Sequence, residues 1–263
     1  MKAEALMAAF LLAAAAAAVA DHIPVPPDGA LTFQARTALI ANFGNADLVA
    51  ELLGGQESVN QALQFHESLT LGGYYRVLKN LKLGAFYRLQ AGVHHDDDWV
   101  TNASPPPGFV WQDTSTRFEH LLMLDASPRF LLDFLPGRDW VFMLKGRFIY
   151  NASYENQMSL MARPELTWFW IQDRVPILNV SLSYELYFPL NFGTTLLYQS
   201  YPYLSLLWHA TPEVGIELGG AWKSTTWSPS QDVMNSGQSI AGAFPITFHT
   251  WVVSLGVVYT PSF

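Results

Sequence analysis

The 263-residue sequence has no cysteine, few charged residues and no long uncharged apolar run after residue 20. Without cysteine no disulfide can form, so backbone pairing and packing must hold the fold together. Without such a run no transmembrane helix is expected there, because a helix needs about 20 consecutive apolar residues to cross a bilayer. The formal net charge of −8 argues against nucleic acid as a partner. Half of the residues are nevertheless hydrophobic, so the apolar side chains are dispersed along the chain.

The first 20 residues, MKAEALMAAFLLAAAAAAVA, form a segment unlike the rest of the chain. Lys2 precedes an alanine-rich apolar run that ends in Ala18-Val19-Ala20, which is the small-x-small pattern of a secretory cleavage site. The run is short and alanine is only mildly hydrophobic, so we predict a cleavable signal peptide over residues 1–20. An N-terminal membrane anchor is the alternative. No cysteine follows the cleavage point to carry a lipid anchor.

Beyond residue 20 the apolar residues recur at every second position, which is the pattern of β-strands with one face in apolar surroundings. Leu178, Val180 and Leu182, for example, alternate with Asn179 and Ser183. The sequence predicts ten such strands, in the windows 31–43, 62–77, 81–93, 115–126, 140–150, 157–171, 178–188, 196–209, 214–226 and the C-terminal stretch from residue 246.

Charged residues segregate by phase in these windows, and only Glu67 falls on the apolar phase. The polar phase holds nine basic and five acidic residues. A ten-stranded barrel is narrow, so these side chains could form a packed salt-bridge plug rather than a passage. If a passage exists, the excess of positive charge would favour anions. With two tyrosines, the predicted inward-facing set is Arg36, Arg76, Lys82, Arg88, Arg117, Lys145, Arg147, Arg163, Lys223, Glu119, Asp125, Glu165, Glu185, Glu217, Tyr201 and Tyr203.

The connections between the windows alternate in length. Brief ones such as Lys79-Asn80 alternate with long irregular ones at 44–60, 94–114 and 227–244. Short turns at one end, long loops at the other and an even number of strands are the layout of a bacterial outer-membrane β-barrel. Residues 127–139 are an exception, because their apolar side chains suggest a short interfacial helix. If they instead form a short hairpin, the strand number becomes twelve.

A soluble secreted barrel or sandwich is the alternative, because alternation alone does not tell the inside of a barrel from its outside. The number and length of the windows favour membrane-spanning strands. Large aromatic residues such as Trp168, Phe188 and Trp222 lie near window ends, where strands would cross the headgroup layers. We therefore expect an all-β, antiparallel up-and-down transmembrane barrel over residues 31–263, preceded by a short periplasmic lead at 21–30.

The chain stops on WVVSLGVVYTPSF, an uncharged strand-like stretch. A closed barrel has no free edge, and every backbone group in hydrocarbon must be satisfied. The last strand must then pair with the first. We therefore expect residues 246–259 to pair with residues 31–43.

Leu255, Val257, Tyr259 and Phe263 alternate up to a terminal phenylalanine. This pattern resembles the C-terminal signal of Gram-negative outer-membrane proteins, and it departs from that signal at Pro261. The resemblance covers about nine residues. It implies recognition by the barrel-assembly machinery and a location in the outer membrane.

The segment His94-His95-Asp96-Asp97-Asp98 is the most conspicuous cluster of potential metal ligands. His94, His95, Asp96 and Asp98 are weak candidates for a metal site, because adjacent residues seldom point at one ion. A solvated acidic loop is the expected structure, and no cofactor is expected.

No catalytic constellation is found in the sequence. Outer-membrane proteases pair an Asp-Asp couple with an Asp-His couple, and the counterpart loop at 189–195 contains neither Asp nor His. His120 and Glu67 are polar residues predicted to face lipid, which a bulge or a phase error would also explain.

We expect a non-enzymatic envelope protein, either a narrow porin-like channel or a scaffold whose extracellular loops bind a partner. The alternatives are an outer-membrane hydrolase with a rim site and a loop-mediated adhesin. Expected partners are outer-membrane lipid with lipopolysaccharide, the barrel-assembly machinery and small solutes.

Overall fold

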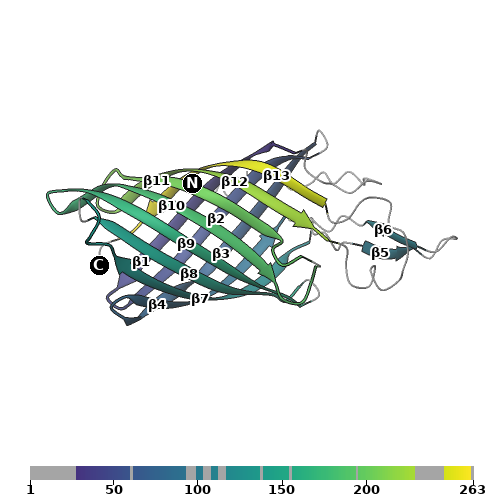
Figure 1. Ribbon diagram of the computed structural model, residues 1–263, viewed down its shortest axis with the longest axis horizontal. Coiled ribbons are helices and arrows are strands. Elements are labelled where there is room, and N and C mark those ends of the chain that lie inside the picture. The colour runs from purple at the N-terminus through teal and green to yellow at the C-terminus, as the bar shows by residue number, and fades with distance from the viewer. Residues whose placement is uncertain are drawn as a thin grey trace, which may run out of the picture.

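The computed structural model describes residues 28–59, 62–92, 99–102, 108–111, 117–136, 139–153, 156–193, 195–228 and 246–261. These residues form a closed β-barrel of eleven strands (Figure 1). No helix in the described part of the chain is long and apolar enough to cross a membrane. The barrel strands are β1 (Ala30–Phe43), β2 (Ala46–Val59), β3 (Ala62–Leu78), β4 (Leu81–Ala91), β7 (Glu119–Leu131), β8 (Trp140–Asn151), β9 (Gln157–Gln172), β10 (Val175–Pro189), β11 (Gln199–His209), β12 (Val214–Trp227) and β13 (Ile246–Tyr259).

Every strand pairs antiparallel with its neighbour in the chain except at the point of closure. There β1 runs parallel to β13, from Ala30 opposite Thr250 to Leu39 opposite Tyr259. An odd number of alternating strands leaves the first and last pointing the same way, so a parallel seam is the geometric result. The expected pairing of 246–259 with 31–43 is confirmed, with that parallel direction.

The strand number of eleven corrects the sequence prediction of ten or twelve. The missing strand is β2, which occupies most of the stretch predicted as a long loop at 44–60. A tight turn at Gly44-Asn45 leads into it, and Gly44 adopts a φ of 71°, a left-handed conformation that glycine reaches without a steric penalty. β2 then pairs along its whole length with β1 and β3.

The predicted interfacial helix at 127–139 is also wrong. β7 continues as a strand to Leu131, and the described residues beyond it form turns, with no helix among them. Phe130 and Leu131 lie at the end of this strand with exposed side chains, and Phe130 stacks on Phe142 of β8 with 6.5 Å between the ring centroids.

The two ends of the barrel differ. We call one the short-turn rim, which holds the turns at 44–45, 79–80, 173–174 and 210–213 and the end of β13. That rim also holds the longer β7–β8 connection at 132–139. The other is the long-loop rim, which holds the connections at 92–118, 152–156, 190–198 and 228–245, the short one at 60–61 and the start of β1. β5 (Trp99–Asn102) and β6 (Gly108–Trp111) form a separate hairpin that lies beyond the long-loop rim in Figure 1.

The outer surface of the barrel is apolar. Leu52, Leu124, Leu182 and Leu255 are all more than half exposed, at 54, 60, 57 and 59%. The alternate positions, such as Asp125 between Leu124 and Ala126, are buried in the interior. The polar phase of the strands therefore faces inward and the apolar phase faces outward.

Outward-facing aromatic side chains pair at both rims. Trp140 and Trp168 have ring centroids 6.3 Å apart near the short-turn rim. Trp222 and Trp251, toward the long-loop rim, have centroids 4.4 Å apart. Aromatic girdles at two levels are typical of barrels that cross a membrane.

Candidate functional site

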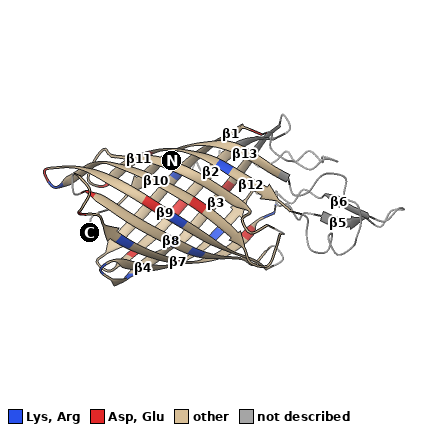
Figure 2. Cartoon of the chain, viewed as in Figure 1, with Lys and Arg blue, Asp and Glu red and all other residues tan. Residues whose placement is uncertain are grey.

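The interior of the barrel carries charged side chains of both signs in equal number. Acidic and basic residues occur together in the middle of the barrel's length (Figure 2). Among the described strand residues, those that face inward and are not solvent-exposed are seven basic and seven acidic: Arg36, Lys82, Arg88, Lys145, Arg147, Arg163 and Lys223, with Asp47, Glu51, Glu119, Asp125, Glu165, Glu185 and Glu217.

The predicted excess of four positive charges, nine basic against five acidic residues, is therefore not found among the described inward-facing residues. Asp47 and Glu51 add two carboxylates, and the sequence analysis missed both because it placed them in a loop. Arg76 is exposed at the short-turn rim. Arg117 is exposed and precedes β7, so it lies outside the strands. Among the inward-facing residues whose burial is described and that are not solvent-exposed, the two signs are therefore balanced.

The first ionic cluster joins strands on both sides of the seam. The Arg36 Nε donates to Glu51 Oε2 at 2.8 Å, and Arg36 Nη1 also pairs with Glu217 Oε2. Arg36 thus connects β1 with β2 on one side and β12 on the other. It reaches β12 across β13, where Gly256 lies directly between Arg36 and Glu217 in the register.

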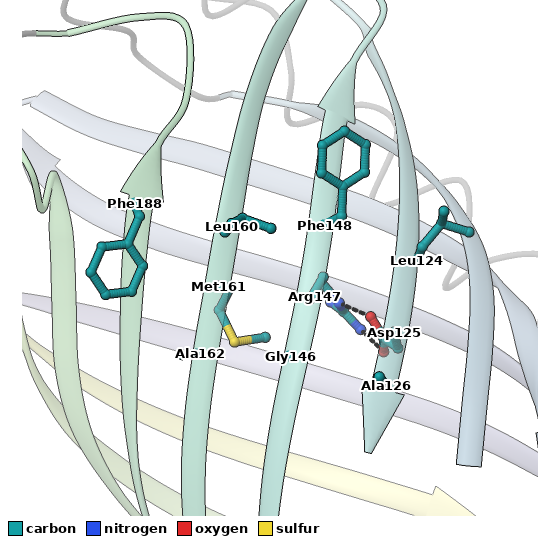
Figure 3. Close-up of a pocket in the computed structure, with 10 residues that line it drawn as sticks. All are labelled: Leu124, Asp125, Ala126, Gly146, Arg147, Phe148, Leu160, Met161, Ala162 and Phe188. Carbon is teal, nitrogen blue, oxygen red and sulfur yellow. Dashed lines mark hydrogen bonds and ion pairs between the residues drawn. The ribbon is translucent and has the colours of Figure 1, made fainter. Parts of the chain in front are cut away.

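The second cluster surrounds Asp125, whose side chain has no exposed surface. Arg147 donates to both carboxylate oxygens, from Nε at 2.6 Å and from Nη2 at 2.8 Å (Figure 3). Lys145 Nζ lies 3.0 Å from Asp125 Oδ2, and Tyr74 donates its hydroxyl to the same oxygen at 2.8 Å. Lys145 also donates to the Tyr74 hydroxyl at 2.8 Å. A buried carboxylate is stable here because several donors satisfy it.

The third cluster centres on Arg163. Its Nη2 lies 3.1 Å from Glu165 Oε2, and its Nη1 lies 3.3 Å from Glu185 Oε1. Tyr187 donates to Glu185 Oε2 at 2.7 Å, and its ring stacks on Tyr201 with centroids 5.9 Å apart. Arg163 thus pairs with two carboxylates, and Tyr187 holds one of them, Glu185, from the other side.

Inward-facing glycines allow these contacts to cross an intervening strand. Gly84 lies between Tyr74 and Asp125 in the register, and a Cβ at Gly84 would meet the Tyr74 ring at 2.7 Å. On β12, Gly219 leaves room for the Tyr203 hydroxyl, which lies 3.0 Å from Ser254 Oγ of β13; a Cβ at Gly219 would clash with both groups. Without a side chain on the middle strand, side chains two strands apart meet.

The clusters around Arg36 and Arg163 are only partly buried. The side chains of Arg36 and Arg163 keep 29 and 26% of their surface exposed, and those of Glu51 and Glu165 keep 19% each. A packed core would exclude water from groups at this depth. The clusters around Arg36 and Arg163 are therefore less tightly enclosed than the one around Asp125.

Other inward-facing residues lie nearer the rims. Lys82 pairs with Asp47, and Asp47 also accepts from Asn42 Nδ2 at 2.7 Å, toward the short-turn rim. Glu119 accepts from Gln90 Nε2 at 3.0 Å and from Asn151 Nδ2 at 2.8 Å, toward the long-loop rim. Lys223 faces inward between buried Ala221 and Thr225.

Polar residues also lie on the outer face. The His120 Nδ1 is 2.6 Å from the Tyr87 hydroxyl, and Glu67 shares the outward phase of β3 with exposed Phe65. His249 lies outside against Trp222, with ring centroids 5.3 Å apart, and its ring lies 2.8 Å from Asp28 Oδ1. The hydrogen bond from His249 holds the pKa of Asp28 below its usual range.

Leu255, Val257 and Tyr259 of the C-terminal pattern face outward on β13. Phe263 and the metal candidates His94, His95, Asp96 and Asp98 lie outside the described residues, as does the predicted signal peptide. Among the residues that the structure does describe, no group of three or more potential ligands could hold a metal ion.

A hollow of about 470 Å³ lies on the outer side of β7 to β10 (Figure 3). Ala126, Gly146 and Ala162 are adjacent in the register and form its shallow floor. Phe148 and Phe188 belong to its apolar walls. The hollow is continuous with the apolar outer surface.

Comparison of the chain with protein-family models, with curated proteins and with solved structures finds no match. The site itself must therefore carry any functional conclusion.

Proposed function

We propose that the protein is an outer-membrane β-barrel that forms a narrow, hydrated passage for small polar solutes. The observation that carries this proposal is the charge-balanced interior, in which ion-paired side chains at mid-barrel keep part of their surface open to water. Balanced charge gives the passage little preference for ions of either sign, because neither sign is left uncompensated.

The membrane location rests on the apolar outer surface and on the aromatic pairs near both rims. A soluble barrel would bury its apolar phase and expose its charged phase, which is the reverse of the arrangement here. Outer-membrane lipid and lipopolysaccharide are then the surroundings of the barrel. The outward-facing Leu255, Val257 and Tyr259 suit the proposed recognition by the barrel-assembly machinery.

Planar-bilayer recording of the refolded protein tests the proposal. We expect small, discrete conductance steps and a reversal potential close to zero across a KCl gradient. Glu51→Gln removes one interior carboxylate and leaves Arg36 with Glu217 alone, so it should shift the reversal potential toward anion selectivity.

The matched control is Asp173→Asn, which makes the same charge change on the exposed β9–β10 turn. It should leave the reversal potential unchanged, and its positive φ of 51° suits asparagine. Complete absence of conductance would contradict the passage and favour a scaffold, for which the β5–β6 hairpin beyond the long-loop rim is the candidate contact.

A further inference from the structure

We infer that the barrel interior contains a binding subsite for a small oxyanion, such as phosphate or a carboxylate, between β8 and β9. Lys145, Arg147 and Arg163 form it. The inference deepens the proposed passage by naming the class of solute that pauses in it.

The register places like charges directly opposite each other. Lys145 of β8 is paired with Arg163 of β9, and Arg147 lies two residues along β8 on the same inward face. Directly opposite like charges destabilise a strand pair, because the two side chains lie within about 6 Å. Arg76 and Lys82 are also opposite, but at the short-turn rim, where Arg76 is exposed to solvent.

Two of the three carboxylates that balance these cations lie on the flanking strands. Asp125 lies on β7, on one flank of Lys145 and Arg147. Glu185 lies on β10, on the far flank of Arg163, whereas Glu165 lies on β9 two residues from Arg163 and opposite Met143 of β8. Lys145, Arg147 and Arg163 therefore lie together on the paired strands β8 and β9, with Glu165 as their neighbouring carboxylate on that pair.

Not all hydrogen-bond donors of these cations are used by the carboxylates. Arg147 uses Nε and Nη2 on Asp125, and Arg163 uses both Nη atoms on its two glutamates. The Arg163 Nε is buried without a hydrogen-bond partner in the described structure. Arg163 also keeps the largest exposed side-chain fraction of the three, 26%, against 10% for Lys145 and 13% for Arg147.

An oxyanion between β8 and β9 would lower the repulsion between Lys145 and Arg163 and accept hydrogen bonds from both. Guanidinium and ammonium groups bind carboxylate and phosphate oxygens through charge-assisted hydrogen bonds, which are stronger than neutral ones. A halide lacks the several acceptor oxygens that donors from two strands can share. The site thus favours oxyanions over chloride.

Isothermal titration of inorganic phosphate into the refolded, detergent-solubilised protein tests the inference without requiring conduction. We expect phosphate to bind the wild type. Lys145→Met should weaken binding about tenfold, the effect of losing one charge-assisted hydrogen bond. Asp125 keeps both hydrogen bonds from Arg147 in this variant, so its fold is retained.

The matched control is Lys223→Met, which removes an inward-facing charge nearer the long-loop rim and should leave the affinity unchanged. The double variant Arg163→Gln with Glu185→Gln keeps the net charge and should still weaken binding. The subsite would be overturned if the wild type did not bind phosphate, or if Lys145→Met and Lys223→Met lowered the phosphate affinity equally. Binding without conductance in bilayers would leave the subsite standing and overturn the passage, so the two failures are distinguishable.

Discussion

At the scale of single residues, the inward glycines determine which side chains meet. Gly84, Gly219 and Gly256 each lie on a strand between two partners that would otherwise be separated by a side chain. Sequence analysis cannot assign this role, because the partners are far apart in the chain. The register that aligns them exists only in the closed barrel.

The Tyr74 contact gives a test of this role. Tyr74→Phe should lower the free energy of unfolding by about 1.5–3 kcal/mol, because it removes a hydrogen bond to an ionised carboxylate. Gly84→Ala should also destabilise, since the new Cβ would displace the Tyr74 ring. The double variant should lose less free energy of unfolding than the two single variants lose together, because both changes remove the same contact. Urea unfolding in detergent micelles measures all three.

The control for this experiment is Gly146→Ala on the outer face. A Cβ there meets no atom nearer than 4.0 Å, so no loss of stability is expected. Strictly additive effects of Tyr74→Phe and Gly84→Ala would show that Gly84 does not act through Tyr74.

At the scale of elements, ten of the eleven barrel strands were predictable from alternation, and β2 was not. Its outward face holds Leu48 and Leu52 but also Ala50 and Gly54, so the apolar phase is weak. Its charged residues Asp47, Glu51 and Glu57 resemble a solvated loop in isolation. Their place in a strand follows only from partners such as Arg36 on β1 and Lys82 on β4.

Single-cysteine labelling tests the strand assignment of β2. The natural chain has no cysteine, so each introduced thiol reports alone. In lipid vesicles, an aqueous maleimide should label cysteine at inward positions Val49 and Leu53. It should fail to label cysteine at outward positions Ala50 and Leu52, which would face hydrocarbon. Mass spectrometry measures the labelled fraction.

Asn45 in the β1–β2 turn is exposed and serves as the positive control for this labelling. A loop would expose all four tested positions to water. Uniform labelling from Val49 to Leu53 would therefore contradict the strand.

At the scale of the whole molecule, the sequence predicted a closed barrel with the charged phase distinct from the apolar phase. It did not predict the charge balance or the direction of the seam, because both depend on β2. One unrecognised strand changes the parity of the barrel and moves two carboxylates into the interior. The candidate site was thus predicted in most of its members, while its net charge was not.

The proposed membrane location gives a further prediction, which concerns the depth of outward-facing residues. Leu182 lies outward in the middle of β10, and Val77 lies outward one residue from the end of β3. Leu182→Arg should destabilise the barrel by about 2–4 kcal/mol, and Val77→Arg by about 0–1 kcal/mol, because the cost of a lipid-facing charge falls toward the interface. Unfolding in phospholipid vesicles measures both.

A water-exposed surface would give a different result. Both positions are about half exposed, so each arginine would then change stability by no more than about 0.5 kcal/mol. Equal and small effects would therefore exclude a bilayer around the barrel.

The parallel pairing of β1 with β13 has a topological consequence. The start of β1 and the end of β13 therefore lie at opposite rims of the barrel. In the proposed membrane location, protein domains fused ahead of Ala30 and after Tyr259 would lie on opposite sides of the membrane.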